Sequence, residues 1–336
     1  MRHRFVAGGS VLAALIAAVS LAAVPLAGQA ASSGTTTTGA TKTGTPPRTP
    51  WGDPNLQGVW SYATLTPLER PAALAGREFF TPEEAAARDA AVGVDRPPSP
   101  GDTGTYNALW FDRGKISSNL RTSLIVDPPD GRLPLTPEAQ KRLAARAEDR
   151  RAHPADSWLD RSAWDRCITY HGVPPISTGY NNTYQIFQTP GYVAILVENI
   201  HDVRIIPLDA RPRLGDSIRQ WNGDSRGHWE GSTLVVETTN YSDKTELRFP
   251  ASRHTRAVER FTRVDDNLID YQFTIDDPTV YTRPWTAVRP MPRLQDYRIY
   301  EYACHEANYA MTGILGGARE EEKAAEEAAK KHTGSR

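Results

Sequence analysis

The feature that most constrains the fold is a series of short apolar or alternating segments between residues 184 and 304. In the clearest one, polar side chains alternate with four apolar ones, Ile269, Tyr271, Phe273 and Ile275. A strand with one buried face requires this period of two. Short turn sequences separate the segments without intervening helices, which favours an antiparallel meander over a parallel sheet. The predicted strands cover 184–188, 192–198, 203–208, 228–229, 233–239, 257–264, 268–275 and 298–304.

We therefore expect a mainly-β protein whose meander forms a lipocalin-like barrel or a sandwich. Helices are expected within an insertion at 81–160, because Thr81 and Thr136 each precede a Pro-Glu pair. Threonine at the N-cap and proline at the first helical position favour helix initiation, so helices are predicted over 81–91 and 136–152. A charged segment rich in Ala, Glu and Lys predicts a helical tail at 318–336. One β-rich domain is expected over 51–317.

The N-terminal 30 residues have the pattern of a secretory signal. Basic residues start the chain, an apolar run covers 11–27, and small residues at Gly28 and Ala30 fit cleavage after Ala30. The alternative is an uncleaved membrane anchor, because about 17 apolar residues approach the length that spans a bilayer. Residues 31–50 have almost no large apolar side chains and predict a disordered linker. We expect an exported protein, periplasmic or extracellular, with no membrane span in its mature form.

The charge and cysteine counts exclude several classes of protein. Lys plus Arg is 39 and Asp plus Glu is 40, a formal net charge of −1, so a nucleic-acid partner is not expected. Two cysteines are too few for a disulfide scaffold or a four-cysteine zinc site. In an oxidising compartment we expect Cys167 and Cys304 to pair. Two buried free thiols are the alternative.

The chemistry expected from the sequence centres on histidine beside carboxylate. The chain has no H-E-x-x-H, P-loop or G-x-G-x-x-G motif, and no cofactor or metal site is expected. His201 lies between two apolar segments, with Glu198 close in sequence, so the two are candidates for a catalytic base and the group that orients it. The alternative is a histidine that neighbours an acid by chance.

Ligand-binding residues are expected where aromatic, amide and charged side chains gather. Aromatic rings supply contact area, and polar groups fix a ligand's orientation. The alternative is that the same residues pack a hairpin and its loops. The candidates are Tyr180, Asn182, Arg204, Trp221, Asp224, Arg226, Trp229 and Trp285.

Five motifs spread over most of the folded chain resemble those of a family of exported, uncharacterised bacterial proteins. The resemblance implies export but no activity and no catalytic residues. A second likeness, to lipocalin-type barrels, is carried by Gly58 and Trp60 of a G-x-W motif and by the meander. The five motifs are LQGVW (56–60), TSLIVDPPDGR (122–132), YQI (184–186), GDSRGHWEG (223–231) and YACHE (302–306).

Three functions are compatible with these patterns. The first is binding of a small, partly apolar molecule in the mouth of the barrel. The second is an envelope enzyme, a hydrolase, hydratase or isomerase, that uses acid–base chemistry on the same fold. The third is a structural or partner-binding envelope protein. The sequence does not indicate an oligomeric state.

Overall fold

The computed structural model describes residues 47–92, 111–170 and 172–333. The expected signal at 1–30 and most of the expected linker lie outside these residues. The last four linker residues are folded, because Thr49 is buried and Arg48 forms a backbone bridge with Pro54. The described residues all fall within one compact unit, Thr43–Arg336. None of their helices is long and apolar enough to cross a membrane.

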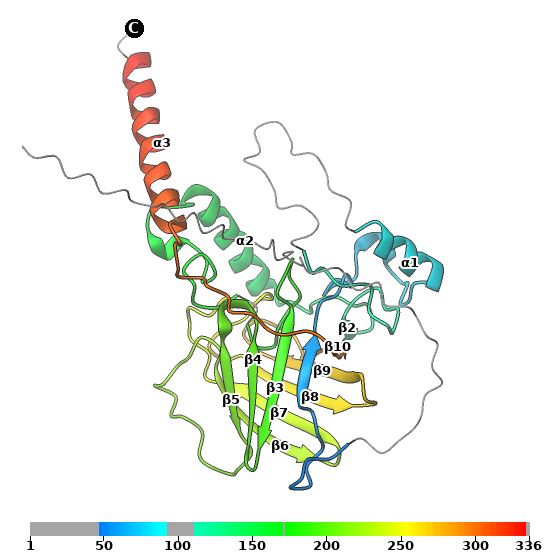
Figure 1. Ribbon diagram of the computed structural model, residues 1–336. Coiled ribbons are helices and arrows are strands. Elements are labelled where there is room, and N and C mark those ends of the chain that lie inside the picture. The colour runs from blue at the N-terminus through cyan, green and yellow to red at the C-terminus, as the bar shows by residue number, and fades with distance from the viewer. Residues whose placement is uncertain (1–46, 93–110, 171, 334–336) are drawn as a thin grey trace, which may run out of the picture. The chain divides into compact units, whose positions relative to one another are not determined.

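Two antiparallel sheets form the β-rich part of the protein (Figure 1). This confirms the mainly-β, antiparallel architecture expected from the sequence. The smaller sheet has the order β1-β3-β4-β5, with β1 Gly58–Ser61, β3 Thr183–Thr189, β4 Tyr192–Val197 and β5 Val203–Pro207. The larger has the order β2-β10-β9-β8-β7-β6, with β2 Ile125–Asp127, β6 Asp224–Glu230, β7 Thr233–Thr239, β8 Arg256–Arg263, β9 Leu268–Asp276 and β10 Trp285–Pro292.

Period-two alternation places the core as predicted. The four apolar residues of β9 are fully buried, and their polar neighbours face outward.

The turn between β3 and β4 forms at Gly191, whose φ of 80° is a left-handed conformation that glycine adopts without a Cβ clash. Sequence reasoning therefore locates the strands whose two faces differ most in polarity.

Strand β10 was not predicted, and a predicted strand at 298–304 does not form. Pro290 and Pro292 suggest a loop, because proline cannot donate to a sheet ladder. In β10 both lie beyond Thr286 and Ala287, the residues that pair with the short strand β2. The 298–304 segment is irregular, and its cysteine forms a disulfide instead of a ladder.

Three α-helices accompany the sheets in the described residues: α1 Pro82–Ala90, α2 Pro137–Ala152 and α3 Ala310–Thr333. Both predicted N-caps are present. The Thr81 side chain accepts from Glu84 N in a reciprocal capping box, and the Thr136 side chain accepts from Ala139 N. Helix α3 begins earlier than the predicted tail. Short 3₁₀ turns cover Ala72–Leu74, Trp158–Asp160 and Asn199–His201.

The two sheets meet at Trp60 of β1, the tryptophan of the G-x-W motif. Trp60 forms a backbone bridge with Arg293, just after β10, and Leu294 N donates to Val59 O at 2.8 Å. The guanidinium groups of Arg263 and Arg293 lie 5.6 and 5.9 Å from the centre of the Trp60 ring. This bridge joins the edge strand β1 of the smaller sheet to the end of β10, the second strand of the larger sheet, without a continuous ladder.

The other edges, β5 and β6, are joined by side chains. Arg204 of β5 donates from Nη1 to Glu259 of β8 at 3.0 Å, and its Nη2 donates to the second carboxylate oxygen. It also donates to Ser225 of β6 at 2.9 Å and Thr238 of β7 at 2.8 Å. The Tyr271 hydroxyl of β9 donates to Glu259 at 2.8 Å. The buried guanidinium therefore connects the smaller sheet to three strands of the larger one, and Glu259 extends the connection to a fourth, β9.

Removing one partner of this pair should destabilise the fold strongly. Glu259→Ala leaves the buried Arg204 charge uncompensated, and we expect the free energy of unfolding in urea to fall by about 3–5 kcal/mol. Glu230→Ala, which removes an exposed carboxylate paired with Arg260, should cost less than about 1 kcal/mol. Equal costs for the two variants would contradict the role assigned to the pair.

Candidate functional site

Arg204, an expected ligand-binding residue, is committed to the protein itself. It is buried between the sheets, and each of its three nitrogens donates a hydrogen bond to a side chain. Releasing one of these donors to a ligand would leave Glu259 or a buried hydroxyl unpaired. Its geometry is that of a structural connection.

The sequence-based prediction overlooked a G-x-S-x-G pattern at 223–227, which in α/β-hydrolases marks a nucleophile elbow. Such a nucleophile needs a sharp strand-to-helix turn, whereas Ser225 lies inside β6. Its hydroxyl accepts from Arg204 and lies 2.9 Å from the hydroxyl of Thr238. Ser225 therefore belongs to the connection between the sheets and not to a serine-hydrolase site.

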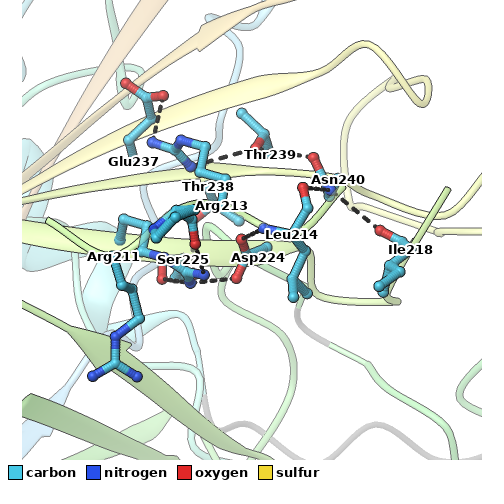
Figure 2. A network of polar contacts seen from close by, with 12 residues as sticks. Arg211, Arg213, Leu214, Ile218, Asp224, Ser225, Glu237, Thr238, Thr239 and Asn240 are labelled. Atoms are coloured by element: carbon cyan, nitrogen blue, oxygen red, sulfur yellow. Dashed lines mark hydrogen bonds and ion pairs between the residues drawn. The ribbon is translucent and has the colours of Figure 1, made fainter. Parts of the chain in front are cut away.

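Asp224 and Arg226 hold the loop that precedes β6. Asp224 pairs with Arg226 and accepts from Leu214 N at 3.1 Å. Asn240, the residue after β7, donates from its side-chain amide to the carbonyl oxygens of Leu214 and Ile218, at 3.0 and 3.2 Å (Figure 2). These contacts explain the concentration of charged and turn residues in this part of the sequence.

The three expected tryptophans do not converge. Trp285 is fully buried and packs edge-to-face on Phe249, with ring centres 5.2 Å apart. Trp229 packs against the core from β6. Trp221 lies 5.7 Å from the Arg166 guanidinium. None of the three lines either cavity described below.

Asn182 and Tyr180 shape the loop that enters β3. The Asn182 side chain accepts from Thr178 N at 2.7 Å and donates to Asp112 O at 2.7 Å and Thr178 O at 3.0 Å. The Tyr180 carbonyl accepts from the Thr178 hydroxyl at 3.2 Å. The buried Asn182 amide thus joins the loop before β3 to the segment around Asp112. This is the structural role that the sequence analysis gave as the alternative to ligand binding.

Glu198, the expected catalytic partner, is buried where β4 ends. Its Oε1 accepts a hydrogen bond from the Tyr297 hydroxyl, whereas Oε2 has no hydrogen-bond partner among the described residues. Burial raises the pKa of Glu198, although the hydrogen bond from Tyr297 favours the ionised form. The nearby Asp112 raises it further. Burial of the carboxyl is therefore the main reason that its pKa is raised.

The turn after Glu198 is strained. Ile200 has a φ of 58°, which is rare for a β-branched residue, and strain of this kind is frequent at functional sites. Both polar side-chain atoms of the buried Asn199 lack a partner within the described part of the chain. The backbone of His201 belongs to this turn, but its side chain lies outside the description, so its expected pairing with Glu198 stays a prediction.

A second buried guanidinium, Arg289 of β10, lies between the rings of Tyr62 and Tyr271, 5.2 and 5.4 Å from their centres. None of its three nitrogens has a hydrogen-bond partner among the described residues. Burial lowers the pKa of Arg289. The side chain has no exposed surface, so a ligand could reach it only if the surrounding aromatic rings moved.

The predicted disulfide is confirmed, with the Cα atoms of Cys167 and Cys304 5.7 Å apart. It ties the segment before β3 to the chain that leads into α3. Cys304, Trp164 and Asn181 help to line a cavity of about 500 Å³ at this junction. Trp164 stacks on Tyr170 with ring centres 4.8 Å apart, and it also lines a second, larger cavity. Cys167 N donates to Trp164 O at 2.9 Å, so the disulfide lies next to the tryptophan that the two cavities share.

The larger cavity is a groove of about 1110 Å³ between α2 and the segment 245–251. Its apolar lining comes from both sides, with Leu143 and Ala147 on the helix and Leu247, Phe249 and Ala251 on the segment. Trp164 and Tyr170 line it as well. A volume of this size can hold a drug-sized or somewhat larger molecule.

Arginines dominate the polar lining of the groove. Arg142, Arg146 and Arg150 are spaced by four residues and so share one face of α2. Arg248 lies across from them, 5.4 Å from the centre of the Tyr170 ring. Arg151 also lines the groove, whose only acidic lining residue is Glu246.

The groove therefore combines an apolar surface with more arginines than acidic residues. The four-residue spacing of arginines between 142 and 150 is the sequence signal that could have indicated a basic face on this helix. Arg142 donates to Thr279 O at 2.8 Å, and Arg150 lies 3.4 Å from Glu246. No group of three or more potential metal ligands occurs in the described residues.

No protein-family model matches the chain, and neither curated proteins nor solved structures include a match.

The environment of Glu198 predicts a pH-dependent difference in stability between the wild type and Glu198→Gln. Because its pKa is raised in the fold, the buried carboxyl stabilises the protein when protonated, and this contribution is lost as the pH rises through the folded-state pKa. From about pH 4, near the pKa of a free glutamate, to neutral pH, the free energy of unfolding should increasingly favour Glu198→Gln.

Glu83→Gln is the matched control, because the pKa of Glu83 is lowered in the fold whereas that of Glu198 is raised. A hydrogen bond from its own backbone N–H, followed by one from Thr81, lowers the pKa of Glu83, so this variant should lose stability relative to wild type as the pH rises. Urea unfolding at a series of pH values measures both differences. A Glu198→Gln difference that does not change with pH would contradict the assignment.

Proposed function

We propose that this protein binds a small, partly apolar molecule that carries an acidic group, in the groove between α2 and segment 245–251. The observation that carries the proposal is the lining of the groove, where five arginines and one carboxylate border an apolar surface. An apolar surface favours burial of hydrocarbon, and guanidinium groups pair with carboxylates, sulfates or phosphates. A molecule with both parts satisfies both sides of the groove.

Each side chain of the groove has a role in this proposal. Leu143, Ala147 and Phe249 would contact the apolar part of the ligand. Arg146 and Arg248 would pair with its acidic group from opposite walls. Glu246 would set the width, because its carboxylate lies near Arg150 and also accepts from Ala163 N at 3.0 Å.

The sequence alone predicts a ligand in the mouth of a barrel, and the groove is a better candidate than the interior between the sheets onto which such a mouth would open. That space is filled by large side chains with almost no exposed surface, among them Trp60, Tyr62, Tyr184 and Tyr271. Protein interiors packed in this way hold few voids larger than a water molecule. A ligand there would have to displace core aromatic rings, whereas the groove is already open.

Barrel closure and export are further parts of the proposal. The bridge between Trp60 and Arg293 and the connection through Arg204 together support a barrel-like arrangement of the two sheets.

The N-terminal signal pattern and the Cys167–Cys304 disulfide support export to an oxidising compartment. In such a compartment a protein meets lipids and other amphiphiles that carry acidic groups.

A second candidate function is acid–base catalysis at Glu198. The observations that favour it are the burial of the Glu198 carboxyl, which raises its pKa, and the strained residue Ile200 two positions later. A carboxyl with a raised pKa can act as a general acid near neutral pH. This candidate is independent of the groove, because Glu198 does not line it.

The groove proposal predicts selective binding of anionic amphiphiles. Isothermal titration of the full chain with dodecanoate should show binding, whereas dodecyltrimethylammonium, with the same alkyl length and the opposite charge, should bind far more weakly. Arg146→Glu combined with Arg248→Glu should weaken dodecanoate binding about tenfold or more, at least ~1.4 kcal/mol.

The control is Arg298→Glu, which reverses the charge of one exposed arginine that does not line the groove, whereas the groove variant reverses two. Its affinity for dodecanoate should equal that of the wild type. The proposal fails if neither amphiphile binds, if the cation binds as well as the anion, or if Arg298→Glu weakens binding as much as the groove variant does.

A further inference from the structure

Among the described residues, no strand residue on the outer face of the four-stranded sheet is charged. At the rim of this face the guanidinium of Arg211, paired with Asp209, lies 5.0 Å from the centre of the Tyr192 ring. The strand register aligns the residues of this face in three rows. Its most exposed members are Val203, Ile205 and Phe187, which are 59%, 55% and 44% exposed. The rows are Val59, Gln185, Leu196 and Val203, then Phe187, Ala194 and Ile205, then Thr189, Tyr192 and Pro207.

The larger sheet provides an internal comparison. On its outer face Glu237 pairs with Arg256, and Glu230 pairs with Arg260. An antiparallel sheet commonly buries one face and exposes a polar one, and the six-stranded sheet follows this pattern. The outer face of the four-stranded sheet instead exposes Val203, Ile205 and Phe187 side by side, and contiguous exposed apolar surface of this kind marks interaction sites.

We infer that this face is an interaction surface for a second copy of the same chain. A partner with charged side chains opposite the rows of Val203 and Phe187 would have to bury them without counter-charges, which is costly. Two copies of these uncharged rows meet with no charge to compensate. Sheet faces pack on one another about 10 Å apart, and a two-fold axis brings the same face of each copy together.

The size of the face indicates the strength of the dimer. Four strands about 4.8 Å apart and about six residues long cover roughly 400 Å². A standard interface buries about 800 Å² per partner. The sheet face thus supplies about half of a standard interface, and we expect a dimer that dissociates on dilution.

Sedimentation velocity of the full chain over a wide range of concentration tests this inference. The wild type should shift from monomer to dimer, and Val203→Lys combined with Ile205→Lys should weaken dimerisation about tenfold or more. Ile218→Lys combined with Val264→Lys is the matched control, because these residues are 50% and 46% exposed but lie outside the face. The control should dimerise like the wild type.

Phe187→Lys, on a different strand of the same face, gives an independent measurement if the double variant does not fold. Circular dichroism identifies a misfolded variant. A wild type that stays monomeric at all concentrations would overturn the inference, as would equal weakening by the control. Binding of the monomer to phosphatidylcholine vesicles without dimerisation would overturn it in favour of a lipid surface.

Discussion

The buried ion pair between Arg204 and Glu259 is the interaction on which the arrangement of the two sheets depends. Among the described residues, the backbone bridge between the sheets lies near Trp60, and β5 and β6 share no ladder. Charge and hydroxyl contacts replace that ladder. Gly227 makes the close approach possible, because a Cβ there would lie 2.9 Å from side-chain carbons of Ile206 and Leu208. The space between the sheets is therefore packed.

A packed interior leaves function to the surface, and the fold builds a groove there from two differently anchored walls. The Trp164 wall lies beside the disulfide, because Cys167 N donates to Trp164 O at 2.9 Å. Helix α2 is held at its start, where Thr136 N donates to Val280 O at 2.9 Å and Ala139 is buried. Further along, Arg150 lies 3.4 Å from Glu246, and because the arginine of this pair is 55% exposed, the pair adds little to the anchoring of the helix.

The sequence predicted the parts of the fold that depend on local patterns. Alternation located β9, and Thr81 and Thr136 located two helix starts, because those signals lie within a few residues. Strand β10 escaped prediction because Pro290 conceals a strand whose pairing partners are distant in sequence. The two cysteines were paired correctly from compartment chemistry alone.

The site was harder to predict, because it depends on contacts between distant residues. Arg204 and Glu259 are 55 positions apart, so Arg204 could not be recognised as the partner of a buried carboxylate. Glu198 was singled out for its neighbours in sequence, but its raised pKa follows from burial that only the fold creates. The arginines of α2 share a face by spacing, yet the groove they border exists only because segment 245–251 packs nearby.

The most direct test of the groove as the ligand site is anomalous diffraction from crystals grown with 12-bromododecanoate. The bromine marks the end of the alkyl chain, and its position does not depend on any variant folding correctly. We predict a bromine peak between α2 and Phe249, with the carboxylate near Arg146 or Arg248. A peak between the two sheets, beside Arg289 and Tyr271, would contradict the account and place the ligand in the interior of the fold.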